Sequence, residues 1–167
     1  MTPAELLADG FTRVLDDGTA VLDGLDEAAL TTRLRGIGNP IGWLVWHLTR
    51  VQDDHVADVA GTEQVWTAQG YVERFGLPLD PRDHGYGHTH DQVDLVRAPA
   101  ELLADYLGAT HEATLAFLTT VGEGDLDKVV DTRWDPPVTL GVRLVSVVND
   151  CTQHVGQAAF VRGLLGA

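Results

Sequence analysis

Apolar residues recur at three- and four-residue spacings in four long segments of this 167-residue chain. Such spacing gathers apolar side chains on one face of an α-helix. No part of the chain shows the sustained alternation of apolar and polar residues that is typical of a strand. We therefore predict an all-α fold, a four-helix bundle with a long crossover loop between its second and third helices. The expected helices run from Pro3 to about Leu25, from Pro40 to about Ala60, from Pro99 to about Val121, and from about Thr139 to Leu165.

The crossover segment, residues 61–98, contains several prolines and glycines among isolated aromatic residues. This composition predicts short helical turns within a long ordered loop. A connection of this length in a compact domain is usually functional. Before the last helix, Pro136 and Pro137 predict an extended connector. The last helix is apolar on most sides, so we expect it to be the most buried of the four.

The overall composition limits the classes of function. A length of 167 residues fits one domain, which we expect to span residues 1–167. The formal charge of −14 disfavours nucleic acid and anionic lipid surfaces as partners. The chain starts with acidic rather than basic residues and has no apolar run long enough for a bilayer, so we expect a cytoplasmic protein without a membrane partner. Cys151 is the single cysteine, in agreement with a reducing compartment.

A histidine closes the apolar stretch "GWLVWHL", residues 42–48. On the second helix, His47 shares one face with Leu44, Leu48 and Val51, so its ring is expected to point into the bundle. By itself, an inward histidine is more often a hydrogen-bonded core residue than a metal ligand. Additional residues are therefore needed to choose between these two interpretations.

Asp150 and His154 lie four residues apart on the last helix, which places both side chains on one face. A carboxylate in so apolar a segment is expected to be paired, hydrogen-bonded or bound to a metal. One interpretation is a structural Asp150–His154 pair. The other is a divalent metal site made by His47, Asp150 and His154, with one or more coordination positions open to water or substrate. The residues alone leave both interpretations open.

The order of these motifs resembles the DinB-like superfamily of metal-binding four-helix bundles, and specifically its mycothiol S-transferase-like branch. "GWLVWHL" and the distant "VSVVNDCTQHVGQ" correspond to a histidine on the second helix, followed by an acidic residue and a histidine on the fourth. The intervening "RFGLPLDPRDHGYGHTH" and "TRWDPPVTLGVRLVSVVND" extend the resemblance over nearly the whole chain. The resemblance implies that His47, Asp150 and His154 are the metal ligands.

Two positions depart from the pattern of this branch. Asp150 stands where glutamate is common, and its side chain is one methylene shorter. Gln157 stands where many relatives have a further histidine. Both departures bear on which metal the site takes. We expect zinc first, because of the histidine ligands and the open site, with nickel, manganese and ferrous iron as the other candidates.

The resemblance implies a thiol S-transferase. A metal held by these three residues can lower the pKa of a bound thiol and present the thiolate as a nucleophile. The thiol implied by this branch is mycothiol, and its partner substrate is a small-molecule electrophile, with a role in detoxification or stress response. Two alternatives remain open: a metal-dependent hydrolase that activates water at the same site, and a non-catalytic metal-binding bundle. Relatives are often dimers, so we expect a homodimer.

Several further residues are candidates for the substrate pocket. His55 lies two helical turns from His47, too far to share one metal, and is expected at the rim of the site. Cys151 is expected to be inert packing in a buried helix. We predict that the substrate pocket is formed by Trp43, Asp54, Tyr86, His88 and Gln157.

Overall fold

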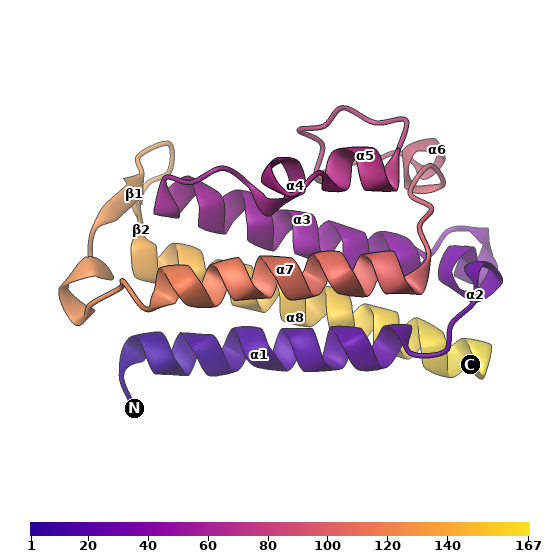
Figure 1. The fold of residues 1–167 in the computed structure, drawn as a ribbon, viewed down its shortest axis with the longest axis horizontal. Helices are drawn as coiled ribbons and strands as arrows, with labels where there is room; N and C mark the ends of the chain where they lie inside the picture. Colours follow the sequence, from indigo (N-terminus) through magenta and orange to yellow (C-terminus); the bar gives the residue numbers. More distant parts are fainter.

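Four long helices dominate the computed structural model, which describes residues 1–167 (Figure 1). They are α1 (Pro3–Leu22), α3 (Ile41–Ala60), α7 (Ala100–Leu118) and α8 (Leu140–Leu165). Both α1 and α3 pack against α7 and α8, so the four helices lie side by side along the length of the molecule. The prediction of a mainly helical protein is confirmed. None of the helices has the length and the apolar character needed to cross a bilayer.

Short elements occupy the connections between the long helices. The crossover from α3 to α7 carries three short helices, which lie over the outer side of α3 in Figure 1. The short elements are α2 (Glu27–Thr31), the 3₁₀ helix η1 (Leu34–Gly36), α4 (Val65–Ala68), α5 (Tyr71–Phe75), α6 (His90–Val93), the 3₁₀ helix η2 (Glu123–Asp125), and the strands β1 (Val129–Asp131) and β2 (Val138–Thr139).

The sequence predicted an extended connector before α8. In the structure this connector forms a β-hairpin instead. β1 and β2 pair antiparallel, with Val129 opposite Thr139 and Asp131 opposite Val138. The register is irregular between these two pairs. Thr139 then caps α8 through a hydrogen bond from Val142 N–H to its hydroxyl oxygen. Thus two short runs of β-branched residues form a hairpin once they lie opposite each other, although each run is too short to signal a strand in the sequence.

The expectation that the last helix is the most buried is wrong. α3 has the greatest share of buried residues, including a continuous buried run over residues 41–50. α8 leaves Val142, Val145 and Phe160 exposed. The physical reason is the packing: α3 contacts α7 and α8 on one side and α2 and α4 on others, while α8 has an uncovered outer side. Apolar composition alone does not report which side of a helix meets a neighbour.

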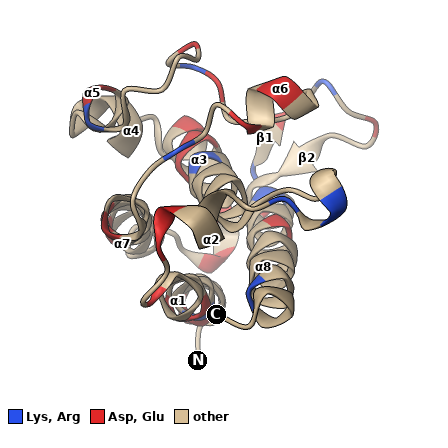
Figure 2. Cartoon of the chain, turned by 90° about the vertical axis from the view of Figure 1, so that its right-hand side faces the viewer, with Lys and Arg blue, Asp and Glu red and all other residues tan.

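Acidic residues are spread over α1, α3, α6 and α7, and basic residues are fewer (Figure 2). Two ion pairs between these classes are buried, Arg143–Asp131 and Arg50–Asp53. Arg50 and Asp53 on α3 lie 3.6 Å apart and are 0% and 3% exposed at their side chains. The Asp53 carboxylate accepts hydrogen bonds from the N–H groups of Val65 and Trp66 and from the Tyr106 hydroxyl. This network joins α3 to α4 and α7 beneath the crossover.

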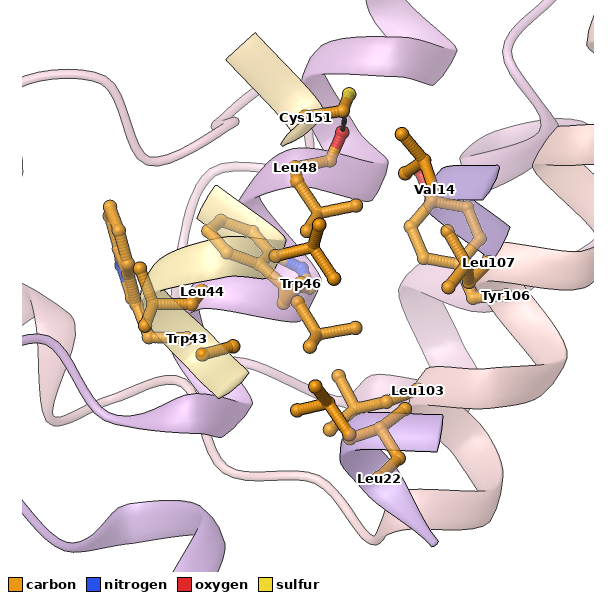
Figure 3. Close-up of a cluster of buried hydrophobic side chains, with 14 of the residues drawn as sticks. Val14, Leu22, Trp43, Leu44, Trp46, Leu48, Leu103, Tyr106, Leu107 and Cys151 are labelled. Atoms are coloured by element: carbon orange, nitrogen blue, oxygen red, sulfur yellow. Dashed lines mark hydrogen bonds between the residues drawn. The ribbon is translucent and has the colours of Figure 1, made fainter. Parts of the chain in front are cut away.

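A single cluster of buried apolar residues fills the space between the long helices. Figure 3 shows part of it, with Cys151 next to Leu48. The Cys151 thiol donates to the Leu48 carbonyl oxygen at 3.5 Å, and burial raises the pKa of this thiol far above its ordinary value. A buried thiol held in the protonated form is a poor nucleophile. The structure is therefore consistent with Cys151 as packing.

Candidate metal centre

The structure brings together one histidine of α3 and an acidic residue and a histidine of α8. One ligand atom each from His47, Asp150 and His154 lie within 4.8 Å of one another. These residues are more than 100 positions apart in the chain, and the direct packing of α3 on α8 makes them neighbours. Ligand atoms around a tetrahedral zinc ion lie about 3.3 Å apart, so small side-chain movements would let the group hold a divalent ion.

The ring of His47 is held from two sides. Its Nδ1–H donates to the carbonyl oxygen of His84, and Trp43 stacks on it with ring centroids 4.6 Å apart. With Nδ1 carrying the proton, Nε2 has the free lone pair that a metal ligand needs. Burial lowers the pKa of His47 to about 4, so the ring is neutral at pH 7. This residue is therefore oriented and in the correct protonation state to bind a metal.

His154 has an equivalent partner on its own helix. Its Nδ1 lies 3.2 Å from Oε1 of Gln157, an oxygen that can only accept, so Nδ1 carries the proton. The Nε2 atom is left free and lies 3.7 Å from Oδ1 of Asp150. Gln157, predicted as a pocket residue, here orients a candidate ligand. In both histidines, Nδ1 is hydrogen-bonded and Nε2 is available.

Asp150 has one oxygen atom without a partner. Oδ2 is buried and makes no hydrogen bond, although the side chain as a whole is 39% exposed. The apolar sequence around Asp150 predicted a carboxylate that must be paired, hydrogen-bonded or metal-bound, and the structure adds that α8 leaves this side chain partly exposed. A buried carboxylate oxygen without a donor is unfavourable unless a cation faces it. This orphan oxygen fits a metal site better than a purely structural Asp150–His154 pair.

The crossover segment near residues 83–88 lies directly on His47. Gly85 has a φ of +90°, and a Cβ atom at this position would be 2.8 Å from Nδ1 of His47. It would also be 3.0 Å from Trp46 and 3.1 Å from Trp43. A glycine is therefore required both by the backbone conformation and by the close approach. That approach is what allows the His84 carbonyl to reach His47.

A buried hydrogen-bond chain holds this segment in register. The Trp43 indole N–H donates to Nδ1 of His88 at 3.1 Å, and the opposite ring nitrogen donates to the Asp83 carboxylate at 2.9 Å. The same carboxylate accepts from Gly85 N–H at 2.8 Å. The His88 side chain is 3% exposed. It is thus enclosed between Trp43 and Asp83, and the glycine-rich loop acts as a brace for His47.

The remaining predicted pocket residues lie apart from this contact set. The Asp54 carboxylate accepts from the Gln64 side chain at 2.7 Å and makes no hydrogen bond to residues of the brace. Tyr86 is 86% exposed. A pocket of about 360 Å³ does adjoin Asp150, but none of Trp43, Asp54, Tyr86, His88 and Gln157 lines it. Their role in substrate binding remains a prediction.

Sequence reasoning missed several residues around the candidate centre. His84 and Gly85 act through a carbonyl group and a missing side chain, which carry no chemical signal in a sequence. The pocket beside Asp150 is lined in part by His55, Asp131, Arg133 and Arg143. Of these, only His55 was predicted from the sequence to lie at the rim of the site. The Asp131–Arg143 contact of 2.9 Å depends on the hairpin, whose strands the sequence did not signal.

The pKa of His47 predicts a pH dependence of stability. In the unfolded chain a histidine has a pKa of about 6.5, so below that pH the unfolded state binds a proton that buried His47 resists. Stability is complete above pH 6.5 and is lost as the pH falls toward 4, by about 3 kcal/mol. Urea unfolding of the metal-free protein from pH 7 to pH 4 measures this slope. His47→Gln should make the slope shallower; equal slopes for both proteins would contradict the prediction.

Fold and site together define a class: a helical protein that brings two histidines and one carboxylate from facing helices into a group able to hold a divalent metal. The model of the mycothiol S-transferase family matches residues 6–167. The chain therefore belongs to this DinB-like family, and the predicted resemblance is confirmed.

A solved structure is similar over the entire chain. It is described as the crystal structure of a conserved protein from Enterococcus faecalis, with a TM-score of 0.92 and 30% sequence identity. The match covers 100% of this chain and 99% of the other. No protein of curated function matches.

Proposed function

We propose that this protein is a metal-dependent thiol S-transferase. The proposal rests mainly on the paired orientation of His47 and His154, each with Nδ1 hydrogen-bonded and Nε2 free, in one group with Asp150, whose Oδ2 is buried without a hydrogen bond. Family membership supports mycothiol as the thiol cosubstrate. We further propose that residues 1–167 form one domain, a four-helix bundle that works as a homodimer in the cytoplasm in detoxification or stress response.

We propose His47, Asp150 and His154 as the three protein ligands, and zinc as the metal before nickel, manganese or ferrous iron. When bound, the metal would lower the pKa of a thiol so that the thiolate is present at neutral pH. The chain's own residues keep His47 neutral and hold both histidine rings in place through hydrogen bonds to Nδ1. The indole of Trp43 covers the His47 ring, and the crossover brace excludes water from its Nδ1 side.

The first test is metal content. Elemental analysis of the purified protein should find about one divalent metal per chain, and His47→Ala and Asp150→Ala should each lose it. His90→Ala is the matched control, because the exposed side chain of His90 at the start of α6 lies outside the group. Full occupancy in either ligand variant would remove the proposed site.

The second test is turnover by the metal-loaded protein. Alkyl halides and Michael acceptors should be consumed faster with mycothiol than with glutathione, and the product should carry the thiol. Consumption without any thiol would support the hydrolase instead. Metal without turnover, combined with a large metal-dependent rise in melting temperature, would support a non-catalytic bundle.

A further inference from the structure

The pocket beside Asp150 lies between α3, α8 and the β1–β2 hairpin and has a volume of about 360 Å³. Its apolar wall includes Val138 and Trp134, and the Trp134 side chain is 66% exposed. Asp150 belongs both to this pocket and to the candidate metal centre. A molecule in this pocket would therefore sit next to the ion.

Arg133 lines this pocket, and one edge of its guanidinium group makes no hydrogen bond to the protein. Its Nε and Nη2 atoms donate to the two oxygens of Asp131, at 3.0 and 2.8 Å. Nη1 makes no hydrogen bond to the protein, and the side chain is 81% exposed. The Nη1–Nη2 edge thus remains free, and such an edge matches the two oxygens of a carboxylate. Asp131 fixes the arginine without occupying this edge.

Arg143 adds a second positive charge deeper in the pocket. It donates to Asp131 at 2.9 Å and to Nδ1 of His55 at 2.7 Å. Because Nδ1 of His55 accepts, the proton of this neutral ring is on Nε2, which has no protein partner. The pocket therefore offers a second N–H donor beside the arginines.

The charges of the lining favour an anion when the metal is bound. Arg133 and Arg143 balance Asp131 and Asp150, so the lining alone has no net charge. A divalent ion held by Asp150 would add two positive charges to this lining, in a chain whose formal charge is −14. Elsewhere the excess of acidic residues repels anions (Figure 2).

We propose that this pocket binds the carboxylate of a small electrophile that also carries a flat apolar group, with Arg133 as the specificity-determining residue. The carboxylate contacts the free edge of Arg133, and the apolar group lies against Trp134 and Val138. This inference rests on the proposed function, because the ion that makes the pocket positive is the one held by Asp150.

Calorimetric titration of the zinc-loaded protein with benzoate and with benzamide tests the assignment. These probes have the same ring, and only benzoate has a charge. Benzoate should bind more tightly than benzamide, and Arg133→Gln should weaken benzoate about tenfold while changing benzamide less than twofold. Arg133→Lys should recover only part of the affinity, because lysine lacks the planar fork. Trp134→Ala should weaken both probes.

Arg82→Gln is the matched control. Arg82 makes the same backbone and side-chain hydrogen bonds to Asp80 that Arg133 makes to Asp131, but it lies outside the pocket. Its substitution should leave benzoate affinity unchanged. Undetectable benzoate binding, equal binding of the two probes, or a benzoate affinity that Arg133→Gln does not change would each overturn the assignment. The last result would mean that the metal alone holds the carboxylate.

Metal analysis of the same samples separates this inference from the proposed function. Zinc binding without Arg133-dependent benzoate binding would reject the pocket assignment and leave the metal site intact. Arg133-dependent benzoate binding in protein that takes up no zinc would support the carboxylate site and reject the metal-dependent transferase.

Discussion

Gly85→Ala should destabilise the protein by about 2–5 kcal/mol and weaken metal binding about 10- to 100-fold. The added methyl group would be 2.8 Å from Nδ1 of His47 and would meet two tryptophans as well. An L-residue at a φ of +90° is strained in addition. The crossover segment must move outward, which removes the His84 carbonyl from the ring that it orients. Chemical denaturation of the metal-free protein and competitive metal titration measure the two effects.

Gly87→Ala is the control that separates the close contact with His47 from the strain of a positive φ. Gly87 belongs to the same segment and also has a positive φ, of +75°, but no atom lies within 4 Å of a Cβ at that position. This variant should lose only about 1 kcal/mol of stability and retain its metal affinity. If the two alanine variants lose the same stability and bind metal equally well, the loop does not brace His47.

Asp53→Ala should destabilise the protein by about 3–5 kcal/mol. The substitution leaves the fully buried guanidinium of Arg50 without its carboxylate. It also removes the acceptor for the N–H groups of Val65 and Trp66 and for the Tyr106 hydroxyl. Because Arg50 also donates to the Asp83 carbonyl oxygen at 3.1 Å, the damage should reach the brace on His47. Urea unfolding measures the loss.

Asp9→Ala is the control, because it removes an exposed ion pair instead of a buried one. Asp9 pairs with Arg13 at 2.7 Å on α1, and both side chains are largely in solvent. Its removal should leave stability nearly unchanged, because water screens an exposed ion pair. Asp53→Asn should fall between the two alanine variants, because the amide oxygen still accepts one N–H group while the charge facing Arg50 is gone. A loss from Asp53→Ala no larger than that from Asp9→Ala would show that the buried network contributes nothing to stability.

Much of the helical framework could be predicted from periodicity. The expected second helix, Pro40 to about Ala60, agrees with α3 except for its first residue, and the expected third helix extends beyond α7 by a few residues. The first helix ends at Leu22 instead of Leu25, and α2 was not expected. Short elements such as α2 and the hairpin span too few residues to develop a period, so their contacts decide their structure.

The candidate metal group was likewise predicted in part from the sequence, and the rest depended on tertiary contacts. His47 on an apolar face, and Asp150 and His154 four residues apart, could be recognised because helical geometry fixes which side chains share a face. The distinction between a structural pair and a metal site could not be made from spacing. It depends on which ring nitrogen is hydrogen-bonded and on a carboxylate oxygen without a donor, and both are set by groups from other parts of the chain.

The sequence by itself determined that the chain is helical, where its long helices run, and which three side chains are candidate ligands for an ion. These properties follow from local periodicity and residue chemistry. Only the tertiary structure decided that α3 rather than α8 is the buried helix, that Gly85 brings a carbonyl oxygen to His47, and that the hairpin places Arg133 in a pocket beside Asp150. Each of these depends on backbone approach between segments distant in the chain, which residue type and spacing do not encode.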